Sequence, residues 1–143
     1  MKTDRLTAPW WALRVGLGGA AFLAGLDKYF NILADWSAYL SPLAARALPF
    51  SATTFMHIVG VIEITVGLAI LAGLTQLGGY IAGAWLLAIA VNLVTTGHYF
   101  DVAVRDVLMA IAAFTLARLT EAGVAVDERT PAAAYGSTRR VTA

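Results

Sequence analysis

The sequence predicts an all-α integral membrane protein, folded as a four-helix bundle with a short surface helix in its first outer loop. Two observations lead to this class. The chain has 143 residues, of which 59% are hydrophobic and only 13% are charged, whereas soluble domains are about 45–50% apolar and about 25% charged. Four apolar segments also approach the roughly 20 residues that a helix needs to cross a bilayer. We therefore expect residues 1–121 to form a single transmembrane domain.

The first predicted span covers about residues 10–27, and Pro9 suits the first turn of a helix. A weakly basic segment precedes it, as in a signal peptide, but Arg14 interrupts the apolar core that a cleaved signal peptide requires. We interpret the segment as a retained helix. The other three spans are expected at about residues 53–74, 78–96 and 102–119.

The connections between these spans differ in length. Residues 75–79 (TQLGG) predict a tight turn, which would make the second and third spans antiparallel neighbours. The first outer loop is long, and within it Ser41 can cap a helix, Pro42 suits its first turn and Pro49 ends it. The segment 41–48 therefore predicts a short surface helix. It is either an ordinary loop helix or a lid over a site below it.

The distribution of Lys and Arg predicts the orientation of the bundle. The side that holds both termini carries Lys2, Arg5, Arg118, Arg129, Arg139 and Arg140. The opposite side carries Lys28, Arg46 and Arg105. Because positive charge is enriched in cytoplasmic segments, both termini are predicted to be cytoplasmic. Residues 122–143 are predicted to form a disordered cytoplasmic tail.

One polar stripe runs along the first span, since helical residues three, four or seven apart share a face. Its members are Arg14, Gly18, Ala21, Gly25 and Lys28. The small residues on this face favour close packing against a neighbouring helix. Glu63 lies about 15 Å from each end of the second span, so it needs a partner inside the bundle or must be protonated. Either Arg14 pairs with Glu63, or Glu63 keeps its carboxyl for a proton or a ligand.

All four predicted spans bring polar side chains to the outer half of the bundle. The candidates for ligand binding or proton relay are Glu63, His57, Arg105, Asp106, Asn92, Lys28 and Arg14. We expect a pocket in which His57 and Arg105 donate hydrogen bonds to a headgroup and Glu63 takes or relays protons. This hypothesis requires Arg14, Glu63 and Arg105 to face the bundle interior.

The sequence also excludes several kinds of chemistry. The absence of cysteine excludes disulfides, thiol nucleophiles and thiolate metal sites. The two histidines lack HxxxH or ExxH spacing, so no metal site is expected. No phosphate-binding loop, dinucleotide motif or catalytic triad motif is present, and catalytic residues remain unassigned. The net charge of +1 gives no basis for nucleic-acid binding. A redox role would need a bound cofactor or quinone from the bilayer.

Three segments resemble the DoxX family of small four-helix bacterial membrane proteins: LRVGLGGAAFLAGLDKY, HIVGVIEITVGLAILAGL and RDVLMAIAAFTLARL. The similar positions are Arg14, Gly18, Phe22, Gly25 and Lys28, then Gly60, Glu63 and Gly67, then Arg105 and Asp106. The resemblance covers about residues 10–119. The family includes small subunits associated with thiosulfate:quinone oxidoreductase and members linked to redox or detoxification complexes.

The resemblance implies a multi-pass protein of the bacterial inner membrane. It implies an accessory subunit of an oxidoreductase rather than an autonomous enzyme, with no intrinsic cofactor, with quinone as a ligand, and with a partner subunit or further copies of itself. Two alternatives stay open. One is a structural or assembly subunit without chemistry of its own, and the other is a small-solute or lipid-binding transport protein.

Overall fold

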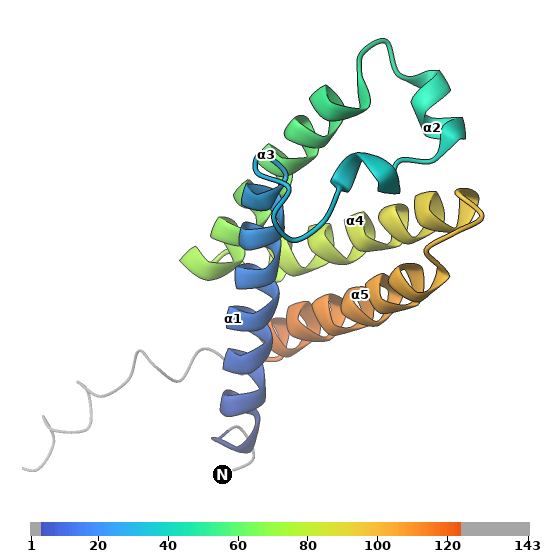
Figure 1. Ribbon diagram of the computed structural model, residues 1–143. Coiled ribbons are helices and arrows are strands. Elements are labelled where there is room, and N and C mark those ends of the chain that lie inside the picture. The colour runs from blue at the N-terminus through green and yellow to red at the C-terminus, as the bar shows by residue number, and fades with distance from the viewer. Residues whose placement is uncertain (1–3, 124–143) are drawn as a thin grey trace, which may run out of the picture.

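The computed structural model describes residues 4–123, and this part of the chain is all-helical (Figure 1). Two short helices lie in the connection between the first two long ones. The elements in order are α1 (Asp4–Asp27), the 3-10 helix η1 (Trp36–Tyr39), α2 (Pro42–Ala47), α3 (Ala52–Ala72), α4 (Thr75–Thr95) and α5 (Phe100–Glu121). The part of the predicted tail from residue 124 onward lies outside the described residues.

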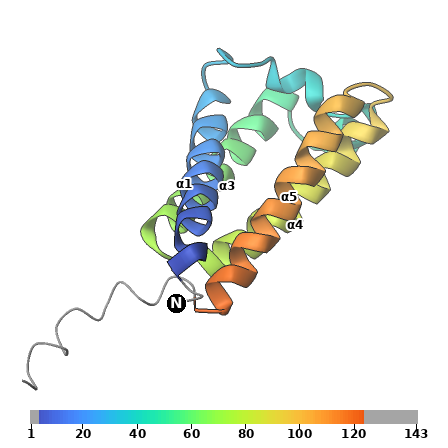
Figure 2. The same cartoon turned by 90° about the horizontal axis from the view of Figure 1, so that it is seen from below.

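The four long helices pack as two pairs, α1 with α3 and α4 with α5 (Figure 2). The pairs touch each other less extensively, through α3 with α4 and α1 with α5. Near the chain ends, Trp10 Nε1 donates a hydrogen bond of 2.8 Å to Thr120 Oγ1. The start of α1 and the end of α5 therefore lie at the same end of the molecule.

Glycines set the spacing of α1 and α3. A Cβ atom added to Gly25 would lie 2.7 Å from the carbonyl oxygen of Gly60, and one added to Gly67 would lie 2.7 Å from that of Gly18. These antiparallel contacts confirm that the glycine face of the first helix packs closely against a neighbour. They also fix the register of α1 against α3, because each pair of glycines can meet at only one level.

Two helix boundaries differ from the sequence-based expectation. α1 begins at Asp4, so the expected start at Pro9 is wrong and this proline lies inside the helix. The predicted turn at residues 75–79 is also wrong, because this segment forms the first part of α4. The turn instead lies at Gly73, whose φ of 112° is the left-handed conformation that ends a helix.

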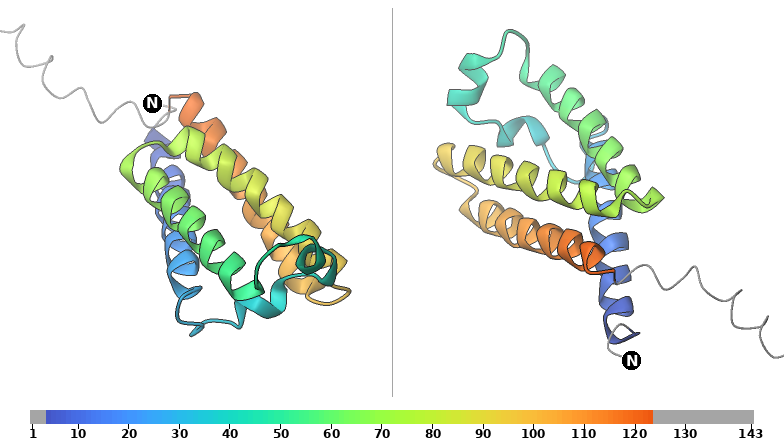
Figure 3. Two further views of the ribbon diagram at one scale, coloured as in Figure 1. Left: turned by 90° about the horizontal axis from the view of Figure 1, so that it is seen from above. Right: turned by 180° about the vertical axis from the view of Figure 1, so that it is seen from behind.

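The predicted short helix in the first loop is confirmed as α2. The Ser41 hydroxyl accepts a hydrogen bond of 3.1 Å from Ala44 N, and Pro42 occupies the first turn. The loop lies at the end of the molecule away from the N-terminus, beside the end of α4 (Figure 3).

Among the described residues, two helices are long and apolar enough to cross a membrane, α3 and α4. Only 33% of the most apolar window of α3 and 28% of that of α4 is buried inside the structure. A core helix of a soluble protein is mostly buried, so these two helices keep most of their apolar surface outward. α1 and α5 are not among these two helices, and both carry several charged side chains.

Candidate functional site

A largely buried ion pair joins Lys28, which directly follows α1, to Glu63 of α3. Lys28 Nζ lies 2.5 Å from Glu63 Oε2, with side-chain exposures of 4% and 11%. The Gly25–Gly60 contact brings the two backbones together one turn away from both residues. Glu63 therefore has a cation partner, and this partner is Lys28, so the alternative that paired Glu63 with Arg14 is wrong.

Arg14 lies instead at the other end of the stripe, against the last turn of α3. Its Nε donates to the carbonyl oxygen of Ile70 at 3.0 Å and its Nη2 to that of Leu71 at 2.7 Å. The guanidinium also lies over the rings of Trp10 and Trp11. Carbonyls in the last turn of a helix lack intrahelical partners and carry partial negative charge. Arg14 therefore caps α3 and takes no part in the polar site.

A tryptophan of the first loop covers the ion pair. Lys28 Nζ lies 3.8 Å from the centre of the Trp36 ring, a cation–π contact. Trp36 Nε1 donates at 2.8 Å to Asp27 Oδ2. The same carboxylate accepts hydrogen bonds from the backbone N–H groups of Ile32 and Leu33. The first loop therefore covers the ion pair, but the residue that covers it, Trp36, belongs to η1. The predicted helix α2 does not supply it.

Asn92 fixes this loop from α4. Its Nδ2 donates to the carbonyl oxygen of Tyr39 at 2.7 Å, and its Oδ1 accepts from Ser41 N at 3.0 Å. Both polar atoms of the amide are engaged with backbone groups of one segment. Asn92 is therefore a positioning residue for the loop.

We expect Asn92→Leu to loosen the loop by removing both hydrogen bonds, a loss of about 1–3 kcal/mol. Trypsin cleavage after the exposed Arg46 of α2 should accelerate by roughly 5- to 100-fold, because cleavage tracks the population of open loop. The cleavage is followed by mass spectrometry of the detergent-solubilised protein. Gln76→Leu, at the other end of α4, should leave the rate unchanged. Equal rates for wild type and Asn92→Leu would show that Asn92 does not hold the loop.

Two of the predicted donors lie away from the ion pair. The His57 ring stacks on the Tyr29 ring with 4.7 Å between the ring centroids. The backbone carbonyl oxygen of His57 accepts a hydrogen bond from Tyr29 Oη. Arg105 is exposed, so the expectation that it faces the interior is wrong. Successive residues of a helix point about 100° apart, so Arg105 and Asp106 cannot both face inward. Asp106 takes the inward position and is half-buried.

Trp85 of α4 and Asp106 of α5 complete the arrangement. Trp85 Nε1 is fully buried, and the Glu63 carboxylate is the acceptor it approaches, although the contact falls outside strict hydrogen-bond geometry. Asp106 is close enough to Arg105, Glu63 and Lys28 to interact with all three charges, and it accepts no hydrogen bond from any described residue. We call Lys28, Glu63, Trp85 and Asp106 the polar site. Helices α3, α4 and α5 contribute one member each, and Lys28 directly follows α1.

The sequence reasoning missed Trp85, although a signal was present. Tryptophan in membrane proteins is enriched at the interfaces, whereas Trp85 stands ten residues from either end of the 21-residue α4. An indole in the middle of an apolar helix carries a donor that must be satisfied there. Trp36 could not be predicted as part of the site, because its contact with Lys28 depends on the loop conformation.

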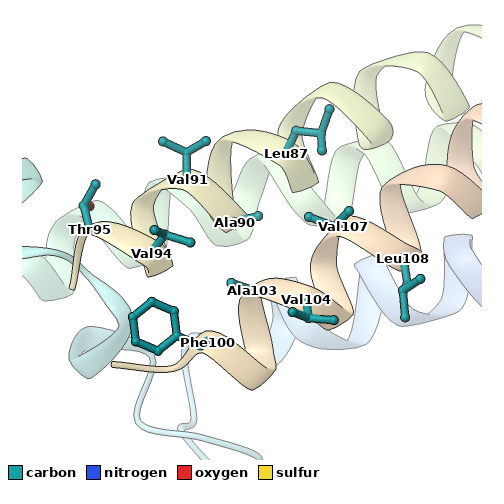
Figure 4. A pocket seen from close by; sticks show the side chains of 10 residues that line it. All are labelled: Leu87, Ala90, Val91, Val94, Thr95, Phe100, Ala103, Val104, Val107 and Leu108. Atoms are coloured by element: carbon teal, nitrogen blue, oxygen red, sulfur yellow. The ribbon is translucent and has the colours of Figure 1, made fainter. Parts of the chain in front are cut away.

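An apolar groove lies on the outward side of the α4–α5 seam (Figure 4). It has a volume of about 630 Å³ and extends from Leu87 and Ala90 of α4 to Phe100, Val104 and Leu108 of α5. Thr95 is the one hydroxyl-bearing residue in its lining. The groove can hold an acyl or isoprenoid chain, but it offers no groups for catalysis.

The chemistry of the polar site is that of binding and proton exchange. Two carboxylates, an ammonium group and an indole N–H converge, without a nucleophile or a motif for cofactor attachment. Within residues 4–123, no group of three or more His, Cys, Asp or Glu side chains is placed to hold a metal ion. Comparisons of the chain with protein-family models, curated proteins and solved structures found no match. The site itself must therefore carry the functional argument.

Proposed function

We propose that the protein is a four-helix, multi-pass subunit of a quinone-linked redox complex in the bacterial cytoplasmic membrane. In this proposal α1, α3, α4 and α5 all cross the bilayer and both termini are cytoplasmic. The outward apolar surfaces of α3 and α4 support the membrane location. The shared position of the start of α1 and the end of α5 supports an even number of spans, and the excess of Lys and Arg at that end supports its cytoplasmic orientation.

The observation that carries the functional part is the unpartnered Trp85 N–H beside the Lys28–Glu63 pair. A buried donor without a partner costs about 1–3 kcal/mol, and an ion pair that only fixed the helix register would not need it. Asp106 likewise has acceptor oxygens without a donor. These open groups fit a small polar headgroup that enters from the membrane, and quinones are membrane-soluble molecules of this kind.

In this proposal, each residue at the polar site would have its own role in binding such a headgroup. Trp85 would donate to a ring oxygen, and Lys28 would keep the Glu63 carboxylate in position. Trp36 would exclude water from the loop side through its contact with the ammonium group. Because the sequence has no cysteine and no cofactor-binding motif, the electrons would come from a partner protein in this proposal.

The resemblance to the DoxX family agrees with this assignment. Lys28, Glu63 and Asp106 are three of the positions on which the resemblance depends, and the same three residues belong to the polar site. We therefore propose membership of that family together with the redox role.

A structural or assembly role is the second candidate. The closed Lys28–Glu63 pair and the glycine contacts of α1 and α3 favour it, since both fix the helix register without any ligand. This candidate leaves the unpartnered groups of Trp85 and Asp106 without an explanation.

The test is purification of the tagged protein from its native membrane in a mild detergent, followed by mass spectrometry and a quinone-dependent activity assay. We expect a redox enzyme to co-purify in stoichiometric amount with wild type and with Trp85→Phe. The activity of the Trp85→Phe complex should fall by about tenfold, consistent with one lost hydrogen bond. Trp11→Phe, at the other end of the bundle, is the matched control and should keep full activity. If Trp85→Phe only lowers abundance, the structural role is the better one.

A further inference from the structure

Helix α3 extends beyond the last turn of α1 at the end of the molecule that carries the first loop (Figure 1). Gly25 and Gly60 lie at the same level, since a Cβ atom added to either one would lie 2.7 Å from the carbonyl oxygen of the other. Tyr29, just past the end of α1, stacks on the ring of His57. His57 lies more than one turn inside α3, about 8 Å from its first residue. Residues 29–33, which we call the apolar turn, therefore begin below the end of α3.

Three large apolar side chains of the apolar turn are exposed. Phe30, Ile32 and Leu33 are 63%, 81% and 69% exposed, and the turn contains no charged residue. Leu23 and Leu26 in the last two turns of α1 are exposed as well. The exposed apolar surface of α1 thus continues along the chain into the turn. Exposed apolar surface of this kind marks contact with a membrane or with another protein.

The backbone N–H groups of the apolar turn are all bonded within the protein. The first three donate to carbonyl oxygens in the last turn of α1. Those of Ile32 and Leu33 donate to the Asp27 carboxylate at 3.0 and 2.9 Å. Water would satisfy such donors without help from the protein, whereas lipid chains offer no acceptor for them. The donors of the turn therefore meet the requirement that a membrane environment imposes.

From this depth, this surface and this backbone we propose that the apolar turn is inserted in the outer leaflet of the bilayer, where Phe30, Ile32 and Leu33 contact lipid. The inference rests on the proposed membrane location of α3 and adds a lipid-contact surface to the first loop. The 21 residues of α3 are about 32 Å long, close to the hydrocarbon thickness of about 30 Å. A turn that begins inside α3 therefore lies at the boundary between acyl chains and headgroups. Asp35, charged and exposed, marks the point at which the chain returns to water.

The same features favour lipid over a protein partner. Protein interfaces combine apolar contacts with direct hydrogen bonds and a polar rim. Two side chains of the apolar turn carry polar groups. Tyr29 donates to the carbonyl oxygen of His57, which leaves Asn31 as the one amide of the turn that could pair with a partner. Lipid needs no hydrogen bonds from the protein and is therefore the better occupant of this surface.

Spin labelling in membranes tests this inference, and the chain suits the method because its sequence contains no cysteine. Ile32→Cys carries a nitroxide label on the purified protein in vesicles of phosphatidylethanolamine and phosphatidylglycerol. Power saturation measures the accessibility of the label to oxygen, which concentrates among acyl chains, and to a water-soluble nickel chelate. We expect the ratio of oxygen to nickel accessibility to exceed that of a label at Arg46→Cys by roughly threefold or more, as for a side chain about 5–10 Å into the headgroup–acyl boundary.

Two reference labels bracket the result. Val61→Cys, exposed near the middle of α3, defines contact with acyl chains. Arg46→Cys, exposed on α2, defines contact with water. Nickel accessibility at Ile32 as high as at Arg46 would overturn the inference. Low accessibility to both reagents would overturn it as well, because a second copy or a partner subunit would then cover the turn.

The Asp27 carboxylate gives a second test. Asp27→Asn keeps the shape of the side chain but leaves it one acceptor oxygen, so it can no longer hold all three of its donors. The label at Ile32→Cys should become more mobile, and its accessibility ratio should fall toward that of Arg46→Cys. Glu121→Gln, at the other end of the bundle, should leave the label unaltered. An unchanged spectrum in Asp27→Asn would contradict the role of this carboxylate in holding the turn.

These outcomes are distinguishable from failure of the proposed function. A label at Val61 that favours oxygen, together with one at Ile32 that favours nickel, would keep the membrane location and remove only the insertion of the turn. A label at Val61 that favours nickel would remove the membrane location of α3 and the insertion with it. The redox role is judged separately, by whether a redox enzyme co-purifies.

Discussion

Lys28→Met is expected to lower the free energy of unfolding by about 3–5 kcal/mol, the range observed when one partner of a buried ion pair is removed. The variant leaves the largely buried Glu63 carboxylate without its cation. It also removes the cation beneath the Trp36 ring, so the loop loses a contact. Unfolding in mixed detergent micelles, titrated with dodecyl sulfate and followed by circular dichroism, measures the loss.

Two further variants test whether the loss of stability comes from breaking the buried ion pair or from removing any positive charge. Lys28→Met combined with Glu63→Leu should recover most of the stability, since replacing both partners by apolar residues is often neutral. Arg118→Met breaks the exposed pair with Glu121, whose side chains are 74% and 33% exposed, and should cost at most about 1 kcal/mol. If Lys28→Met unfolds at the same detergent fraction as wild type, the ion pair does not stabilise the fold.

Much of the fold could be predicted from local sequence patterns. The long apolar runs placed all four long helices, and the caps at Ser41 and Pro42 placed α2. The turn between α3 and α4 was misplaced because this segment contains two possible glycine positions. Gly73 adopts the left-handed conformation. Gly78 instead packs against α3, since a Cβ atom added to it would lie 2.6 Å from a side-chain atom of Ile70. Only that contact between helices decides which glycine makes the turn.

The candidate site was less predictable because it depends on the register of α1 against α3. Arg14 and Lys28 lie on the same face of α1, so the sequence alone offers Glu63 either cation. The glycine contacts set Lys28 opposite Glu63 and Arg14 opposite the end of α3. Likewise, the pair Arg105–Asp106 shows that one residue faces inward, but the packing of α5 determines which one.

The glycine contact that sets this register gives the other large expected effect. Gly25→Leu should destabilise the protein by about 3 kcal/mol or more, above the usual range for overpacked sites. A Cβ at this position would lie 2.7 Å from Gly60 O, 2.8 Å from Ile64 N and 2.9 Å from Glu63 Cβ. Two of these atoms are backbone and cannot turn aside, so α1 and α3 must separate.

Gly16→Leu is the matched control, because a Cβ at Gly16 meets nothing within 4 Å. Leucine is a better helix former than glycine by up to about 1 kcal/mol, so Gly16→Leu should leave the unfolding transition unchanged or slightly raised. The same titration with dodecyl sulfate compares the two variants. Separation of α1 from α3 would also pull Lys28 away from Glu63, so Gly25→Leu should make a second change, Lys28→Met, less costly than in the wild type. Additive losses would mean that the glycine contact and the ion pair act independently, and that the register of α1 is fixed by something other than Gly25.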